Sequence, residues 1–115
     1  MLIIQTSQYK CTLPSRMNIC VGTNDPMGKL FAPASWDFVM LYKSGKMTKE
    51  TYEKKYLTLL EHRKKQWPEH FKKLLKKNEI TFVCFCAPGA FCHRVLAARW
   101  FEEAFSGKCM YGGEV

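Results

Sequence analysis

Hydrophobic and polar residues follow two different spacings along this chain, and each spacing predicts one kind of element. Short apolar runs rich in β-branched and aromatic residues are typical of buried strands. Four such runs occur, at residues 2–6, 17–21, 81–86 and 109–111. Between them, apolar residues recur every three or four positions, which is the spacing of an amphipathic helix.

The helical segments carry recognisable start and stop signals. Pro33 suits the first position of a helix that runs to about Lys43, and Thr48 suits the N-cap of a helix that runs to about Lys65. Trp67 and Pro68 open a third helix, which runs to about Lys77. A fourth begins near residue 92 and ends before 106–107. We expect Trp36, Val39 and Met40 to share one face of the first helix, and Trp67, Phe71, Leu74 and Leu75 to face inward on the third.

The predicted order of elements is β, β, α, α, α, β, α, β. Alternation of strands and helices favours an α/β fold, and 115 residues are enough for one domain, 1–115. We therefore expect a three-layer α/β domain whose small, mainly parallel sheet is flanked by helices.

The stretch from Thr81 to Trp100 carries most of the chemistry. A strand, 81–86, is followed by a Pro-Gly loop and then by a helix whose first turn holds Cys92, His93 and Arg94. The first turn of a helix presents unpaired N–H groups and the positive end of a dipole, so anions bind there. We expect these three residues to be the catalytic or anion-binding group.

Further residues are predicted to surround that group. Ligands of open α/β sheets bind beyond the carboxyl ends of the strands. Residues that meet this condition, or that could reach the same cleft from the loop or the tail, are Ser7, Tyr9, Cys86, Gly89 and Glu114.

The central stretch also carries a family resemblance. VCFCAPGAFCHRVLAARW resembles the signature of the YeaO-like family, domain of unknown function 488, and the segments at 5–9, 31–36 and 111–114 resemble its opening, middle and closing motifs. The three-layer domain that we expect resembles the Rossmann-like and nucleoside-deoxyribosyltransferase-like folds. The family's name implies no activity.

Three chemistries remain open for the cysteines. Cys92 could be a thiolate favoured by the helix N-terminus and Arg94, with His93 as its base or ion-pair partner. A metal, either zinc or an iron–sulfur cluster, could instead be held by Cys84, Cys86, Cys92 and His93. Alternatively, the cysteines are structural and behave as small buried hydrophobes, which we expect of Cys84, Cys11, Cys20 and Cys109.

The formal net charge of +8 adds an alternative of another class. Arg63 to Lys77 concentrates basic side chains, and the helical spacing turns four of them outward: Lys72, Lys73, Lys76 and Lys77. Such a surface attracts phosphates. The chain could therefore be a non-catalytic module that binds nucleic acid or an acidic partner protein.

Composition favours a cytoplasmic protein without a membrane span. The N-terminus lacks the basic and apolar regions of a signal peptide, and no run approaches the roughly 18 apolar residues of a span. The function we expect is binding or processing of a nucleotide, nucleobase or other anionic ligand. The sequence leaves open whether the ligand is turned over.

Overall fold

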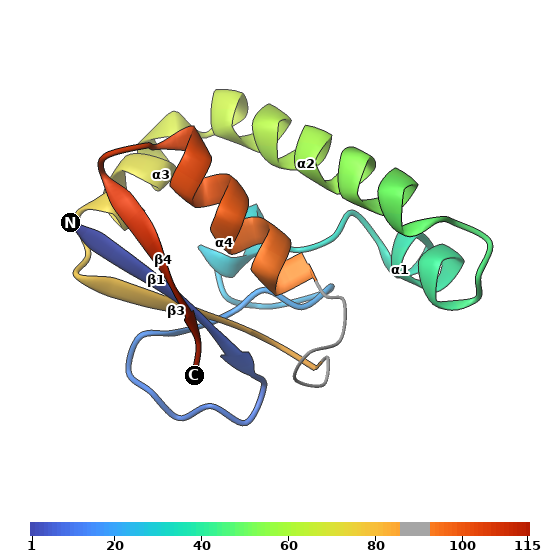
Figure 1. Ribbon diagram of the computed structural model, residues 1–115, viewed down its shortest axis with the longest axis horizontal. Coiled ribbons are helices and arrows are strands. Elements are labelled where there is room, and N and C mark those ends of the chain that lie inside the picture. Colours follow the sequence, from blue (N-terminus) through green and yellow to red (C-terminus); the bar gives the residue numbers. More distant parts are fainter. Residues whose placement is uncertain (86–92) are drawn as a thin grey trace.

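The computed structural model describes residues 1–85 and 93–115. It contains a four-stranded, all-parallel sheet in the order β2-β3-β1-β4. The strands are β1 (Leu2–Gln8), β2 (Arg16–Asn18), β3 (Glu79–Cys84) and β4 (Cys109–Glu114). Because all four run in the same direction, their carboxyl ends meet at one edge of the sheet (Figure 1).

Four α-helices and one 3₁₀ turn flank this sheet, and the order of the predicted elements is confirmed. They are η1 (Gly28–Leu30), α1 (Trp36–Lys43), α2 (Lys49–Gln66), α3 (Pro68–Leu75) and α4 (His93–Ala104). The fold is thus α/β with a small parallel sheet and helices around it, as the sequence predicted.

Capping side chains set two helix starts. Thr48 caps α2 by accepting a hydrogen bond from the backbone of Thr51, as predicted. Helix α1 begins at Trp36, three residues later than the predicted start at Pro33, because the side chain of Ser35 accepts from the backbone N–H of Phe38. An N-cap satisfies one of the donors that the first helical turn leaves without a partner.

The strand β2 is shorter than the predicted strand 17–21. Ile19 still donates its N–H to Val83, but the side chain of Asn18 then accepts from the N–H of Cys20 and turns the chain out of the sheet. This exit places Cys20 beyond the carboxyl ends of β2 and β3.

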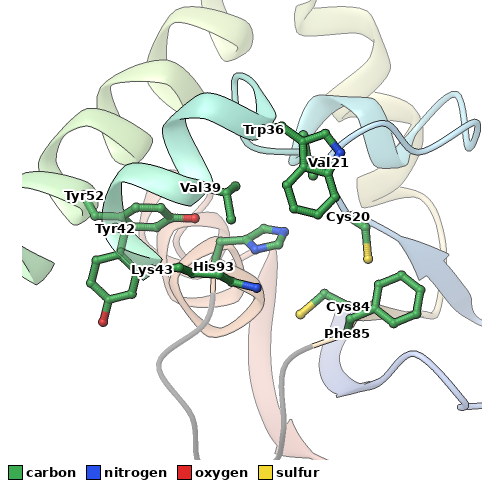
Figure 2. A pocket seen from close by; sticks show the side chains of 10 residues that line it. All are labelled: Cys20, Val21, Trp36, Val39, Tyr42, Lys43, Tyr52, Cys84, Phe85 and His93. Atoms are coloured by element: carbon green, nitrogen blue, oxygen red, sulfur yellow. The ribbon is translucent and has the colours of Figure 1, made fainter. Parts of the chain in front are cut away.

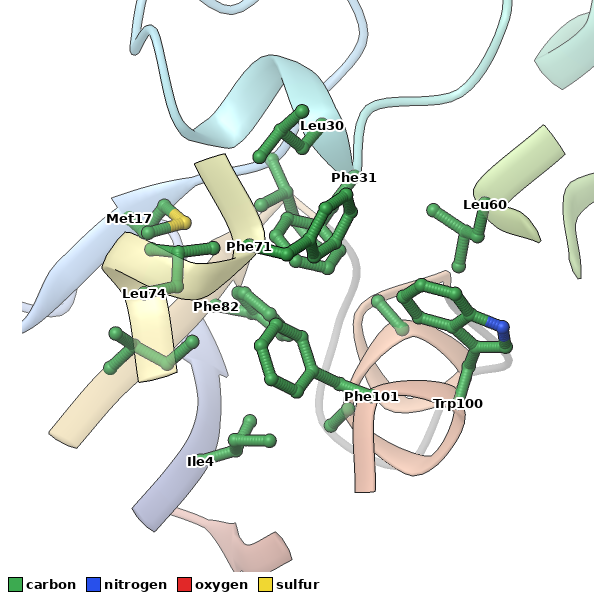
Figure 3. Packing of buried hydrophobic residues seen from close by; sticks show 14 of the residues in the cluster. Ile4, Met17, Leu30, Phe31, Leu60, Phe71, Leu74, Phe82, Trp100 and Phe101 are labelled. Atoms are coloured by element: carbon green, nitrogen blue, oxygen red, sulfur yellow. The ribbon is translucent and has the colours of Figure 1, made fainter. Parts of the chain in front are cut away.

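The main core lies between the sheet and the helices and is unusually aromatic (Figure 3). Phe31 packs against Phe71, Phe82 and Phe101, with ring centroids 4.6–5.7 Å apart. All four rings are fully buried. Burying a phenylalanine contributes roughly 1.5–3 kcal/mol, so this group is a principal source of stability. Trp67, predicted to face inward, is 41% exposed, because it lies at the junction of α2 and α3 rather than on the inner face of α3.

Two side chains of α2 hold the segment before α1 in place. The hydroxyl of Tyr56 donates to the carbonyl of Phe31, and Nη1 of Arg63 donates to the carbonyl of Ala32 at 2.6 Å. Burial lowers the pKa of Arg63. Arg63 therefore has a structural contact, although the sequence grouped it with the basic surface.

Helix α1 differs from the other α-helices in that none of its residues is buried. Trp36 is 61% exposed and Met40 is 50% exposed, so the apolar face predicted for this helix is not part of the core. Figure 1 shows α1 at the far end of α2, away from the sheet. In the described part of the chain, no helix is both long enough and apolar enough to cross a membrane.

Candidate functional site

The candidate site lies at the edge of the sheet where the parallel strands end. The connection from β1 runs past β3 to reach β2, and the connection from β3 runs past β1 to reach β4. Both connections start at the carboxyl ends of the strands, which is where open α/β sheets bind ligands.

A cavity of about 80 Å³ lies beyond the ends of β2 and β3 (Figure 2). Helix α1 forms one wall, the residues that follow β2 and β3 form another, and the first residue of α4 closes the third side. The lining residues are Cys20, Val21, Trp36, Val39, Tyr42, Lys43, Tyr52, Cys84, Phe85 and His93.

Helical spacing places the four α1 residues on one wall. Trp36, Val39, Tyr42 and Lys43 stand at positions i, i+3, i+6 and i+7, which share one face of a helix. Tyr42 and Phe38 both pack on Tyr52 of α2, with ring centroids 5.1 and 4.7 Å away. Aromatic packing against α2 therefore orients the wall.

His93 closes the cavity as a buried, neutral imidazole. Its Nε2 lies 2.6 Å from the carbonyl oxygen of Ile19, and its ring meets the edge of Tyr56. Burial lowers the pKa of His93, and the positive charges of Arg94 and Lys43 act in the same direction, although the negative charge of Cys84 and the bond to Ile19 oppose them. A carbonyl can only accept, so Nε2 carries the proton and Nδ1 is the acceptor of the neutral ring.

Arg94 is 1% exposed and forms a bidentate ion pair with Glu114 at the end of β4. Its Nη2 and Nε lie 2.7 and 3.1 Å from the two carboxylate oxygens. The hydrogen bond from Arg94 lowers the pKa of Glu114, which keeps this carboxylate charged. The third contact of the guanidinium is a hydrogen bond from Nη1 to Sγ of Cys84, at 3.1 Å.

This geometry shows what the guanidinium of Arg94 contacts. Because β4 lies beside β1, its last residues reach the start of α4, and Glu114 pairs with Arg94. The sequence predicted an anion-binding role for Arg94 and a place for Glu114 in the same cleft. The ion pair brings the two residues together, and the anion-binding role stays a prediction.

Ser7 and Tyr9 lie at the same edge of the sheet but do not line the cavity. The hydroxyl of Ser7 donates to the carbonyl of Val115 at 2.9 Å. The ring of Tyr9 stacks on Phe85 at a centroid distance of 4.0 Å, with the guanidinium of Arg16 over it. Tyr9 therefore supports the Phe85 side of the crevice from outside.

Cys86, Gly89 and Cys92 lie outside the described residues, so the roles predicted for them stay predictions. The same holds for a zinc or iron–sulfur site, since two of its four predicted ligands are Cys86 and Cys92. Within 1–85 and 93–115, no group of three or more His, Cys, Asp or Glu side chains is placed to hold a metal ion.

The structure adds cavity residues that the sequence interpretation did not include. Lys43 is the clearest, since it supplies a cation from α1, together with the rings of Trp36, Tyr42 and Phe85. The i, i+3, i+7 spacing of Trp36, Val39 and Lys43 was a usable signal, but the sequence interpretation placed Trp36 and Val39 on one face with Met40 and did not connect that face with a site.

The comparisons with known proteins agree with the family resemblance of the sequence. A family model described as "DUF488-N3a: Active DUF488-N3 subclade" matches residues 10–105, which is most of the chain. No curated protein and no solved structure matches the chain. On the strength of that family match, the chain belongs to the DUF488 family.

Proposed function

We propose that this chain binds a small anionic ligand of the nucleotide or nucleobase type in the cavity between α1 and the end of β3. The observation that carries the proposal is the combination of aromatic walls with a lysine. Trp36, Tyr42 and Phe85 offer ring faces, and Lys43 offers an ammonium group.

The polar groups at the cavity complement such a ligand. In Figure 2 the side chains of Lys43, His93 and Cys84 point toward the same space. His93 supplies a neutral imidazole ring, and Lys43 attracts negative charge. Ring faces with a few convergent polar groups are the usual composition of a small-molecule site.

Ligand-induced thermal stabilisation tests this proposal. The probes are nucleoside monophosphates, nucleosides, free nucleobases and inorganic phosphate. A ligand at a hundred times its Kd stabilises the folded chain by about 2.7 kcal/mol. We expect at least one nucleoside monophosphate to raise Tm more than inorganic phosphate does.

Matched lysine variants locate the binding. Lys43→Ala should weaken the binding of the stabilising nucleotide about tenfold, which corresponds to roughly 1.4 kcal/mol. Lys46→Ala removes the same charge from an exposed position near the end of α1 and should change nothing. Equal effects of the two variants, or no response to any probe, would refute the proposal.

A second candidate function is nucleic-acid binding by the surface of α3. Lys72 and Lys73 of α3 are exposed, as are Lys76 and Lys77, which directly follow the helix, and Phe71 and Leu74 are fully buried, so this segment presents its lysines outward. Lys72 also pairs with Glu69 at 3.2 Å, a weak exposed contact. The arrangement supports an electrostatic surface.

Salt dependence separates this candidate from the first. Affinity for double-stranded DNA should fall steeply with salt, by a slope of about 0.9 per neutralised phosphate. Replacing these four lysines by Gln should abolish it. Replacing Lys46, Lys49, Lys54 and Lys55 by Gln gives the same charge change elsewhere and serves as the control. If both quadruple variants lose affinity equally, net charge rather than this surface is responsible.

A further inference from the structure

Cys84 occupies a different environment from the one expected of a structural cysteine. It ends β3, is 1% exposed, and lines the cavity. Its sulfur accepts the hydrogen bond from Nη1 of Arg94. A guanidinium remains charged at every pH at which the protein folds, so Cys84 has a permanent cationic donor.

Cys109 shows what an ordinary buried thiol of this chain looks like. Its Sγ donates to the carbonyl oxygens of Phe101 and Phe105, at 3.4 and 3.8 Å. Carbonyls only accept, so this sulfur must keep its proton. Burial, helped by the charge of Glu102, raises the pKa of Cys109 to about 11. The sulfur of Cys84 is instead a hydrogen-bond acceptor, because the charged guanidinium of Arg94 donates to it.

The charges around Cys84 balance when its sulfur is negative. Arg94 of α4 and Lys43 of α1 are positive, and Glu114 of β4 is negative. A thiolate at Cys84 brings the formal sum of these four groups to zero, whereas a neutral thiol leaves it at +1, the excess charge being that of the exposed Lys43. Other titratable groups on this side, among the described residues, are neutral His93 of α4, Cys20 after β2, Tyr9 with Arg16 over its ring, Tyr42 of α1 and Tyr52 of α2.

We propose that Cys84 is a nucleophilic thiolate of the cavity, held in place by the Arg94–Glu114 pair, and that it takes small electrophiles at carbon. The proposal shares the cavity with the proposed function but does not depend on which ligand binds there. It also gives Cys84 a chemical role that the sequence assigned to Cys92. Arg94 and Glu114 are positioning residues in this scheme.

Alkylation by iodoacetamide is a simple step that uses such a group. The sulfur lone pair forms a bond to the methylene carbon, the carbon–iodine bond breaks, and iodide leaves with the bonding electrons. Nothing is oxidised or reduced. The thiolate has already lost its proton, so no base is required in the step.

Ultraviolet absorbance of the thiolate tests the proposal without requiring any reagent to enter the cavity. The parent carries Cys86→Ser and Cys92→Ser, which removes the two cysteines outside the described residues. Adding Cys84→Ser should remove a thiolate signal already present at pH 7, with a midpoint below the value of about 8.5 for an ordinary thiol. Adding Cys109→Ser instead should change nothing until the pH approaches 11.

Iodoacetamide labelling, resolved by peptide mass spectrometry, supplies the second readout. At pH 7 Cys84 should react at least about tenfold faster than Cys109, as thiolate character and access to the cavity predict. Glu114→Gln removes the competing negative charge and should move the Cys84 midpoint to lower pH. A purely structural ion pair would leave that midpoint unchanged.

Three results would overturn the proposal. They are a Cys84 midpoint at or above 8.5, labelling no faster than that of Cys109, and a midpoint that Glu114→Gln does not move. All these measurements are made without nucleotide. A negative result for the thiolate therefore does not contradict the ligand-binding proposal. A negative result for nucleotide binding does not affect the thiolate measurements.

Discussion

At the scale of single residues, the ion pair between Arg94 and Glu114 places one positive and one negative charge next to each other at the site. Arg94 is fully buried, while the side chain of Glu114 is 33% exposed. Removing one partner of such a pair leaves a buried charge uncompensated, which is costlier than the pair itself is stabilising.

We expect Glu114→Gln to lower the free energy of unfolding by about 3 kcal/mol near neutral pH. Because Arg94 depresses the folded-state pKa of Glu114, this contribution is complete above the unfolded value of about 4.5 and is lost as the pH falls through the folded value. Urea denaturation of the unmodified protein and of Glu114→Gln, from pH 7 to pH 3, should show that their free energies of unfolding converge. A constant difference over that range would contradict the prediction.

His93 gives a second pH dependence in a different window. Burial depresses its folded-state pKa below 6.5, so the unfolded chain takes up a proton first as the pH falls. The native chain should therefore lose stability below about pH 6.5. His93→Gln keeps a donor for Ile19 but cannot titrate. Its stability should be flatter between pH 7 and pH 5 in thermal melts, and parallel curves would exclude the effect.

At the scale of elements, α2 stabilises the fold by reaching back to the segment before α1. The hydroxyl of Tyr56 is buried on the carbonyl of Phe31, within the aromatic core. Tyr56→Phe keeps the ring and leaves that carbonyl without this donor. We expect a loss of about 1–3 kcal/mol in denaturant titration. Thr58→Val alters an exposed hydroxyl of the same helix and should cost less, so equal losses would count against a role for the buried bond.

Most elements could be predicted from the sequence, because their spacing and caps are local properties. Thr48 and Pro68 mark the starts of α2 and α3 where expected. The strand order could not be predicted, since it depends on pairing between residues distant in the chain. Glu114 reaches Arg94 only because β4 lies beside β1.

For a related reason, the sequence did not predict that α1 forms a wall of the cavity. The apolar face of α1 has the same spacing whether it covers the core or lines a cavity, and the sequence gives no measure of burial. Cys84 was likewise interpreted as a small buried hydrophobe. It is indeed buried, but the guanidinium on its sulfur comes from the helix that follows.

At the scale of the whole molecule, stability is distributed unevenly. The sheet and the aromatic core contain the fully buried side chains, whereas α1 has none. Regions with few buried apolar contacts open locally at low free energy. In native-state hydrogen exchange, amides of α1 should therefore exchange much faster than those of β1 and β3. Comparable protection in all three would show that α1 is part of the same cooperative unit.

An exposed helix that forms a cavity wall has an evolutionary consequence. Substitutions at Trp36, Val39 or Lys43 alter the shape and charge of the cavity, and none of these side chains is part of the buried core. Mutation can therefore reshape the cavity through this one short segment at little risk to folding.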